Sequence, residues 1–267
     1  MRWKTWFGVI EKTNDEVKLV KSRDFVESFL NSSNDPNTLP IPFSIKDVGL
    51  SLFKNEKEYY ATLRDLAIKL TEEKIKQELS KDDKYVIMLL KTLDALNEVI
   101  NVLSEKLRDL KNIKITDICS ELDSRINDLT KLRKNVELEI KKIMERIAPN
   151  LTNIVGASIA ARLLEKAGSL EKLAKMPAST IQLLGAEKSL YKAISRIKKG
   201  KPAKIPKHGV IFQHPFIRFL PKRKRGKMAR FLASKIAIAV KLDYFSCEKR
   251  LDLFKVIKNK YESLRRL

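Results

Sequence analysis

The chain has 267 residues, with 55 Lys and Arg against 33 Asp and Glu, which gives a net charge of +22 at pH 7. A hydrophobic fraction of 43% is enough to form packed cores, so the composition excludes a chain that is disordered throughout. The length is compatible with one large domain or with two or three small ones.

Cysteine usage and hydropathy point to a reducing, aqueous compartment. Cys119 and Cys247 lie far apart and form no CxxC pair, which argues against a disulfide framework and against a cysteine zinc site. No run reaches 18 consecutive apolar residues, and the N-terminus lacks the apolar segment of a signal peptide. We therefore expect a soluble intracellular protein with no membrane partner.

The positive charge is concentrated in the C-terminal part of the chain. Residues 1–149 hold 27 basic and 26 acidic side chains, whereas residues 150–267 hold 28 basic and 7 acidic ones. Such a field attracts polyanions and binds phosphates by counterion release, so nucleic acid is the first candidate partner. A surface that is merely solvated normally mixes both signs, and a membrane surface would require a basic helix with an aromatic face.

The first 80 residues predict a small α/β unit. Short β-like runs at 6–10 and 17–20 are followed by turn-rich segments at 31–37 and 40–42. Over about 56–80 the apolar spacing becomes helical. One side of that helix carries the residues with which it should pack on the sheet: Tyr59, Tyr60, Leu63, Leu66, Ala67 and Leu70.

Two apolar stripes with alternating spacings of four and three predict an antiparallel helical hairpin. The first stripe consists of Leu89, Leu93, Leu96, Ile100, Leu103, Leu107 and Leu110. The second consists of Ile126, Leu129, Val136, Ile140, Ile143 and Ile147, with Arg133 at one position of its seam. The remaining apolar edge of the hairpin could pair with a second copy, but a hairpin within one chain explains the pattern equally well.

Beyond the hairpin the sequence predicts a compact and mainly helical domain. Pro149 closes the hairpin, because proline disfavours helix at the residue before it. A helix over 151–166 with Gly168 as its C-cap is followed by another over 169–175, whose N-cap is Ser169.

Pro177 opens a further segment of this domain. Residues 200–226 are interrupted by four prolines and by Gly209 and Gly226, so we expect a loop with at most a short β-like stretch at 210–212. A helix resumes over 227–240.

Catalytic motifs are missing from this sequence. The glycines form neither GxGxxG nor GxxxxGK[ST], which leaves no support for a dinucleotide site or a P-loop. His208 and His214 lack an HExxH context or a cysteine companion, and the seven carboxylates of residues 150–267 are dispersed. We therefore expect a binding surface and no metal.

Cations interleave with aromatic residues in the C-terminal part, a mixture that suits base stacking and phosphate contacts in RNA. Gly185 permits close backbone approach before the helix that follows it. The candidate RNA-binding residues are Tyr191, Lys192, Arg196, Lys204, Lys207, His208, Arg218, Lys222, Arg223, Lys224, Arg225, Lys227 and Lys235. The four cations at 222–225 also suit a localisation signal.

Six segments, ordered along about 150–245, resemble the Nop domain. They are Ala148-Pro-Asn-Leu-Thr-Asn-Ile-Val-Gly156, Ala167-Gly-Ser-Leu170, Leu173-Ala-Lys-Met-Pro-Ala-Ser-Thr180, Leu184-Gly-Ala-Glu-Lys188, His208-Gly-Val-Ile-Phe212 and Gly226-Lys-Met-Ala-Arg-Phe-Leu-Ala-Ser-Lys235. The preceding hairpin and α/β unit are similar to those of the archaeal Nop proteins of box C/D ribonucleoproteins, so the resemblance covers the whole chain.

The resemblance implies a mainly α scaffold in three parts. Residues 1–82 would form an α/β domain that docks fibrillarin, the RNA 2′-O-methyltransferase, and residues 83–148 a coiled-coil hairpin that homodimerises. Residues 149–267 would form an all-α Nop domain that binds kink-turn RNA together with a ribosomal-type protein.

The implied function is non-catalytic. The chain would organise rRNA and tRNA methylation directed by box C/D guide RNA and its substrate RNA, in the cytoplasm of an archaeon or the nucleolus of a eukaryote. We expect no cofactor on this chain, with S-adenosylmethionine bound by the partner fibrillarin.

The resemblance also implies residue roles. Gly185, Ala186, Glu187 and Lys188 would lie at the composite contact with RNA and its bound protein. Lys207 and His208 would face a flipped base, and Arg230 and Lys241 would contact RNA. The dimer contact would fall on the seam residues of the hairpin.

Three other interpretations remain open at this point. The spliceosomal branch of the same fold would lack fibrillarin docking. A helix-hairpin-helix protein would bind plain duplex DNA, although its glycine pair and a carboxylate cluster are missing. A purely structural coiled coil would leave residues 150–260 as an unfolded basic tail.

Overall fold

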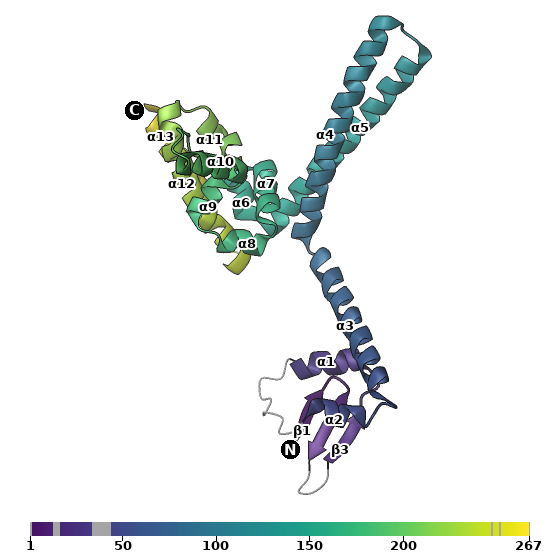
Figure 1. Ribbon diagram of the computed structural model, residues 1–267. Coiled ribbons are helices and arrows are strands. Elements are labelled where there is room, and N and C mark those ends of the chain that lie inside the picture. The colour runs from purple at the N-terminus through teal and green to yellow at the C-terminus, as the bar shows by residue number, and fades with distance from the viewer. Residues whose placement is uncertain (1, 13–16, 34–43, 247, 251, 267) are drawn as a thin grey trace. The chain divides into compact units, whose positions relative to one another are not determined.

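The computed structural model describes residues 2–12, 17–33, 44–246, 248–250 and 252–266 (Figure 1). The chain divides into two compact units, Met1–Leu79 and Ser80–Leu267. The predicted fold class is confirmed, with one small antiparallel sheet, a long helical hairpin and an all-α C-terminal part. Among the described helices, none combines the length and apolar character needed to cross a bilayer.

A three-stranded antiparallel sheet in the order β1-β2-β3 begins the first unit. Its strands are β1 (Arg2–Thr5), β2 (Gly8–Lys12) and β3 (Val17–Lys21). The predicted strand at 6–10 is wrong by two residues, because Trp6 and Phe7 form the turn between β1 and β2. Both side chains are buried, so core packing and not strand pairing accounts for their apolar character.

Helices cover this sheet and complete an aromatic core. They are α1 (Phe25–Ser33), α2 (Ile45–Leu50) and α3 (Glu56–Leu79). The prediction that α3 packs on the sheet is confirmed, since Tyr59, Leu66 and Leu70 share one buried cluster with strand and turn residues. Tyr60 and Ala67 of the predicted face are exposed instead. The predicted turn residues from 34 onward, and Cys247, lie outside the described residues.

The second unit begins with the predicted antiparallel hairpin of α4 (Asp82–Ile113) and α5 (Asp117–Ile147). Towards its tip, Ile100, Leu107, Cys119 and Ile126 form a small buried cluster. At its base, the hairpin contributes instead to the core of the helices that follow, through Val86, Leu90, Ile140, Ile143 and Met144.

Polar contacts also attach the hairpin base to these helices. Lys84 Nζ donates a hydrogen bond to the Gly168 carbonyl oxygen (2.6 Å), and the Leu170 backbone N–H donates to Asp83 (3.1 Å). Hairpin and C-terminal helices therefore belong to one compact unit. The division into three functional parts at 82 and 148 stays a prediction.

Short helices surround one long central helix in the C-terminal part. They are α6 (Pro149–Val155), α7 (Ala157–Ala167), α8 (Leu170–Lys175), α9 (Ala178–Leu183), α10 (Glu187–Lys198), the 3-10 helix η1 (Val210–Gln213), α11 (Pro215–Arg218), α12 (Lys222–Lys241), the π-helix η2 (Leu242–Ser246) and α13 (Asp252–Arg266). Leu232, Ala233 and Ile236 of α12 are fully buried at the centre. This packed core rules out an unfolded basic tail.

Local capping signals in this part are confirmed, but three other predictions are wrong. The Ser169 hydroxyl accepts a hydrogen bond from the Lys172 N–H, and Gly168 is left-handed. The predicted helix over 151–166 is broken at Gly156, whose φ of 80° ends α6.

The β-like stretch at 210–212 is a 3-10 helix, because its backbone finds no strand to pair with in the described unit. The last long helix starts at Lys222 and not at 227, since Pro221 can precede a helix. Part of the predicted loop over 200–226 is therefore helical.

Candidate nucleic-acid interface

A basic groove lies where α9, the segment before η1 and the start of α12 meet. We define it by the residues that line it: Ser179, Gln182, Leu183, Pro206, Lys207, Arg223, Gly226, Lys227 and Arg230. Hydrogen bonds hold its walls together. Gln182 Nε2 donates to the Lys207 carbonyl oxygen (2.6 Å), and the Gly209 N–H donates to the Gln182 carbonyl oxygen (2.9 Å). Four cations and no carboxylate line this groove.

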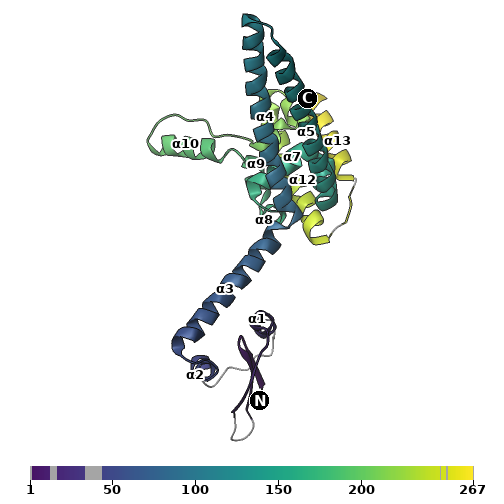
Figure 2. The same cartoon turned by 90° about the vertical axis from the view of Figure 1, so that its right-hand side faces the viewer.

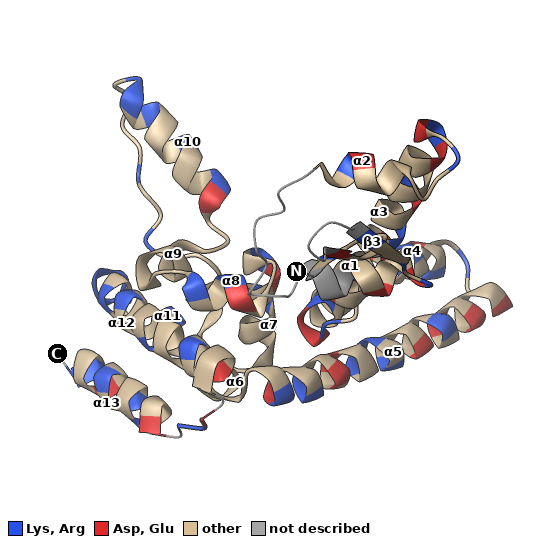
Figure 3. Ribbon diagram, turned by 90° about the horizontal axis from the view of Figure 1, so that it is seen from below, with Lys and Arg blue, Asp and Glu red and all other residues tan. Residues whose placement is uncertain are grey.

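The first turns of α12 strengthen the positive field of the groove. Lys222, Arg223, Lys224, Arg225 and Lys227 lie at the helix N-terminus, where the helix dipole is also positive (Figure 3). Cations at this end lower helix stability, whereas a phosphate nearby gains from both the charges and the dipole. The arrangement therefore favours anion binding at the expense of stability.

The loop between α9 and α10 packs closely against the segment that begins η1. Gly185 is left-handed, with φ of 85°, and a Cβ atom there would lie 2.6 Å from Val210 Cγ2. Glu187 accepts a hydrogen bond from the Gly185 N–H (2.6 Å), which fixes the loop. Ala186 is half-buried and Lys188 is exposed, so the four predicted residues share one surface, formed by the loop and the first turn of α10.

Helix α10 and the segment after it project from the rest of their unit (Figure 2). Only Ala193 of this helix is buried, and Tyr191 is 69% exposed. A shallow surface here is lined by Ser189, Tyr191, Lys192, Ala193, Ser195, Arg196, Ala203 and Lys204. An exposed aromatic ring beside three cations suits a single-stranded or loop region of RNA.

His208 belongs to a stacked cluster beside the groove. Its ring lies parallel to that of Phe212, with centroids 4.3 Å apart, and the Arg225 guanidinium lies 5.4 Å from the same Phe212 ring. Burial lowers the pKa of His208, and the charges of Arg225 and Lys207 lower it further. The imidazole is therefore neutral at pH 7.

The Arg225 side chain forms hydrogen bonds within the chain. Its Nε donates to the Leu220 carbonyl oxygen (2.7 Å) and its Nη2 to that of Arg218 (3.0 Å). Of the predicted cations at 222–225, Lys222 and Arg223 are the more exposed ones.

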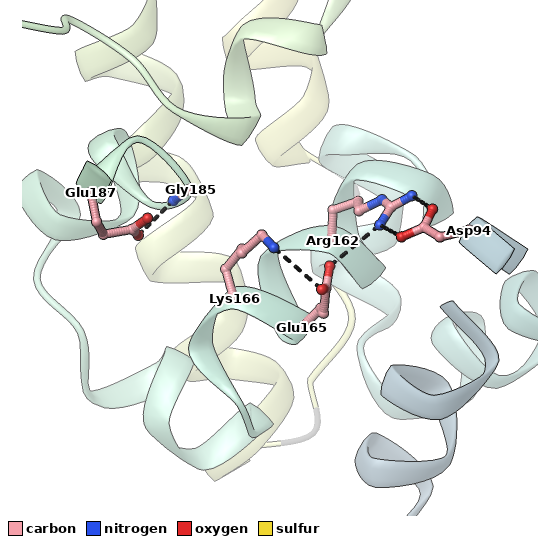
Figure 4. A network of polar contacts seen from close by, with 6 residues as sticks. All are labelled: Asp94, Arg162, Glu165, Lys166, Gly185 and Glu187. Carbon is pink, nitrogen blue, oxygen red and sulfur yellow. Dashed lines mark hydrogen bonds and ion pairs between the residues drawn. The ribbon is translucent and has the colours of Figure 1, made fainter. Parts of the chain in front are cut away.

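Figure 4 shows a chain of polar contacts from α4 of the hairpin to Lys166 of α7, and a separate contact between Glu187 and Gly185. Arg162 of α7 binds Asp94 of α4 with both of its terminal nitrogens, and its Nη1 also lies 3.4 Å from Glu165. The hydrogen bonds from Arg162 lower the pKa of Asp94. Lys166 pairs with Glu165 (3.3 Å), and its side chain reaches the Gly185 loop.

Not all predicted residues gather at one place. Arg218 ends α11, Lys235 lies midway along α12, and Lys241 lies at its far end. At 1.5 Å per residue, Lys241 is roughly 16 Å along the helix axis from Arg230. It cannot belong to the groove.

Sequence reasoning also missed residues that the fold brings to this interface. Ser179 and Gln182 line the groove, and Lys166 lies beside the Gly185 loop. They come from other helices, and no spacing in the sequence connects them to the cations of α12.

The dimer residues predicted on the hairpin also pack within one copy of the chain. These are Leu89, Leu93, Leu96, Ile100, Leu103, Leu107, Ile126, Leu129, Val136, Ile140 and Ile143, all buried or half-buried in one copy. The two stripes face each other and leave other apolar residues exposed near the tip, namely Leu110, Ile113, Ile115 and Ile118. Ile113 is 84% exposed. The dimer contact of the hairpin stays a prediction.

The second histidine has a structural role. His214 is buried, its Nδ1 accepts from the Phe216 N–H (3.2 Å), and its Nε2 lies 3.2 Å from the Ile154 carbonyl oxygen. Burial lowers its pKa. Across the described part of the chain, no three His, Cys, Asp or Glu residues converge as metal ligands would.

Comparison with known families decides what kind of protein carries this interface. Residues 50–263 match the model of the Nop family, described as snoRNA binding domain, fibrillarin. The chain belongs to the Nop family. The matched Nop segment includes the hairpin, the basic groove and the Gly185 loop.

Individual relatives agree with this membership. An uncharacterised NOP5 family protein of Methanocaldococcus jannaschii is 32% identical over 276 residues, which cover 81% of this chain and 66% of the relative. A putative nucleolar protein 5-3 of Arabidopsis thaliana is 44% identical over 51% of this chain and 28% of its own length. The chain thus spans less than two thirds of these relatives.

A solved structure matches along nearly the whole chain. It belongs to a crystal structure of a fibrillarin/Nop5p complex, is 44% identical, and covers 99% of this chain and 100% of its own with a TM-score of 0.59.

Proposed function

We propose that this chain is a non-catalytic scaffold of the box C/D guide-RNA 2′-O-methylation complex. It would connect fibrillarin to kink-turn RNA that is already bound by a ribosomal-type protein, for the modification of rRNA and tRNA. In an archaeon this complex would work in the cytoplasm, and in a eukaryote in the nucleolus.

The observation that carries the proposal is the match to the fibrillarin/Nop5p complex at 44% identity over 99% of this chain. The match includes the first unit, which the family model covers only from residue 50. A near-neutral N-terminal half suits protein docking, and this supports fibrillarin as its partner.

The charge and shape of the C-terminal helices support RNA as the second partner. Residues 150–267 carry 28 basic and 7 acidic side chains, and four of the cations line the basic groove. The Gly185 loop and the projecting α10 would meet the ribosomal-type protein and the RNA beside it.

A dimer would carry two fibrillarin-docking units and two RNA-binding surfaces. The apolar residues exposed at the hairpin tip support a contact between two copies, since a monomer gains nothing from exposing several large aliphatic side chains together. Two fibrillarin molecules and two RNA sites would then be held at set distances.

Such a scaffold acts by proximity. Holding a methyltransferase and the guide–substrate duplex in one assembly makes their encounter effectively intramolecular, which lowers the barrier without chemistry by the scaffold. The methyl donor S-adenosylmethionine would bind fibrillarin, so this chain would need no cofactor.

Reconstitution tests this proposal. The chain is mixed with fibrillarin, the ribosomal-type protein, a box C/D guide RNA, a substrate RNA and S-adenosylmethionine, and methylation of the substrate is measured. We expect methylation with the full mixture and none when this chain or fibrillarin is omitted. Methylation that is equally fast without this chain would refute the scaffold role.

The spliceosomal branch of the family makes a different prediction. Capture of purified fibrillarin by the immobilised full chain separates the two interpretations, with serum albumin as the control protein. Stable capture is expected, and its absence would favour the spliceosomal branch.

A further inference from the structure

Two lysine ammonium groups converge on one aromatic ring at the boundary of α12 and α13. Lys235 Nζ lies 5.4 Å from the centroid of the Phe231 ring, and Lys260 Nζ lies 5.9 Å from the same centroid. The two ammonium groups are thus within about 11 Å of each other. We call Lys235, Lys260 and Phe231 the lysine seat.

Packing holds α13 in place beneath Lys260. Leu253, Ile257 and Leu264 are buried against the core, and the Tyr261 ring stacks on Phe216 with centroids 4.6 Å apart. Lys260 precedes Tyr261, so its backbone is fixed. Lys260 itself is exposed, and its side chain is long enough to bring the ammonium group near Phe231.

The charges of the seat are not balanced by the protein. Within the described ranges, neither Lys235 nor Lys260 forms an ion pair. Two like charges repel each other, and the attraction of each to the Phe231 ring offsets the repulsion only in part. A phosphate bound by either ammonium group would neutralise part of this charge.

We propose that the lysine seat binds a backbone phosphate of the RNA strand that leaves the basic groove. This inference rests on the proposed function and extends its RNA surface to α13. Lys227 of the groove and Lys235 are eight residues apart on α12, which is roughly 12 Å along the helix axis. One strand that follows α12 can therefore contact the groove first and the seat next. Figure 3 shows Lys and Arg, in blue, on both α12 and α13.

Measured salt dependence of RNA affinity tests the seat. The probe is a kink-turn RNA bound by the ribosomal-type protein, and the variant is Lys260→Gln in the full chain. Each phosphate contact contributes about 0.7 to 0.9 to the slope of log affinity against log salt. Loss of one contact should reduce the slope by that amount and weaken binding about five- to eight-fold at roughly 0.1 M salt.

Two further variants separate a seat from a general charge effect. Lys255→Gln removes the same charge from an exposed position of the same helix and should leave both slope and affinity nearly unchanged. Lys260→Arg keeps the charge and should retain most of the affinity. Thermal unfolding of each variant checks that α13 remains folded.

The outcomes distinguish this inference from the proposed function. If Arg230→Ala weakens binding but Lys260→Gln behaves like Lys255→Gln, the RNA surface is correct and the seat is wrong. If Lys255→Gln and Lys260→Gln weaken binding equally, only the general field acts and the seat is again refuted. If Arg230→Ala also has no effect, the proposed RNA surface itself fails.

Discussion

Individual cations of the interface differ in how free they are to bind a ligand. Arg225 donates two hydrogen bonds to backbone carbonyl oxygens, whereas Arg230 forms no hydrogen bond or ion pair within the described part of the chain. Arg230 is exposed and lines the basic groove. A guanidinium in this state can bind a phosphate with two parallel hydrogen bonds.

We expect Arg230→Ala to weaken binding to kink-turn RNA carrying the ribosomal-type protein by about five- to eight-fold at roughly 0.1 M salt, which corresponds to one lost phosphate contact. Filter binding measures the affinity. The matched control is Arg64→Ala, which removes an exposed arginine from α3 of the first unit. Equal affinity of the two variants would show that the groove is not the RNA surface.

His214 makes the stability of the second unit depend on pH. Because burial lowers its pKa in the folded chain, the unfolded chain binds a proton at His214 below about pH 6.5 while the folded chain does not. The contribution of His214 is therefore fully present above that pH and is lost as the pH falls. One group contributes at most about 1.4 kcal/mol per pH unit.

Urea unfolding at pH 7.5 and 5.5 measures this effect. We expect the free energy of unfolding to fall more steeply between these pH values in the parent chain than in His214→Asn, in which asparagine can still cap α11. The control variant His208→Asn, at a half-buried histidine, should retain most of the pH dependence. Identical slopes in the parent and in His214→Asn would contradict the assignment.

At the scale of elements, α12 has an N-terminus whose charges lower the stability of the helix, and it also lies at the centre of the core. Its first turns carry five cations against the helix dipole, and Leu232, Ala233 and Ile236 in its middle are fully buried. The interior packing therefore stabilises a helix whose exposed end is arranged for anion binding.

Charge reversal at each end of α12 tests separately how its cations affect the stability of the chain and its affinity for RNA. Lys222→Glu should raise the free energy of unfolding by about 0.3 to 1 kcal/mol and weaken RNA binding. Lys241→Glu, the same substitution at the other end, should lower the free energy of unfolding. Thermal unfolding and filter binding provide the two readouts, and a loss of stability in Lys222→Glu would refute this account of the helix.

The hairpin tip exposes large apolar side chains that a second copy could cover. We expect the double substitution Ile113→Gln and Ile115→Gln to convert a dimer into a monomer, since both side chains are about four-fifths exposed in one copy. Sedimentation measures the mass. Ile75→Gln, on an exposed face of α3, is the control and should leave the dimer intact. A monomeric parent chain would disprove the dimer.

Elements with strong local signals could be predicted from the sequence. The alternating spacings along the hairpin and the caps at Gly168 and Ser169 determine local structure by themselves, and both are confirmed. The strand predicted at 6–10 is displaced by two residues, and the stretch at 210–212 is not β, because apolar residues in both runs serve tertiary packing.

The residues of the candidate site could likewise be predicted only where the signal is local. The cations of α12 and the Gly185 loop could be found in the sequence, since each lies within one short segment. The groove could not, because its other wall comes from Ser179 and Gln182 of α9, which only the fold brings beside Lys227. The same holds for Lys260 of α13.

At the scale of the whole molecule, charge is separated along the chain. Residues 1–149 are close to neutral and residues 150–267 carry nearly the entire excess of positive charge. Charge alone would bind any nucleic acid. We propose that the Gly185 loop supplies the specificity that charge lacks, by contacting a protein already bound to the RNA.

The most direct test of the scaffold account is a gel shift with a kink-turn RNA, with and without the kink-turn-binding ribosomal-type protein, and with plain duplex RNA as control. We predict a stable complex only when that protein is present on the kink-turn RNA. Equal binding to every RNA, with or without the protein, would show that the positive charge acts without specificity and would contradict the account.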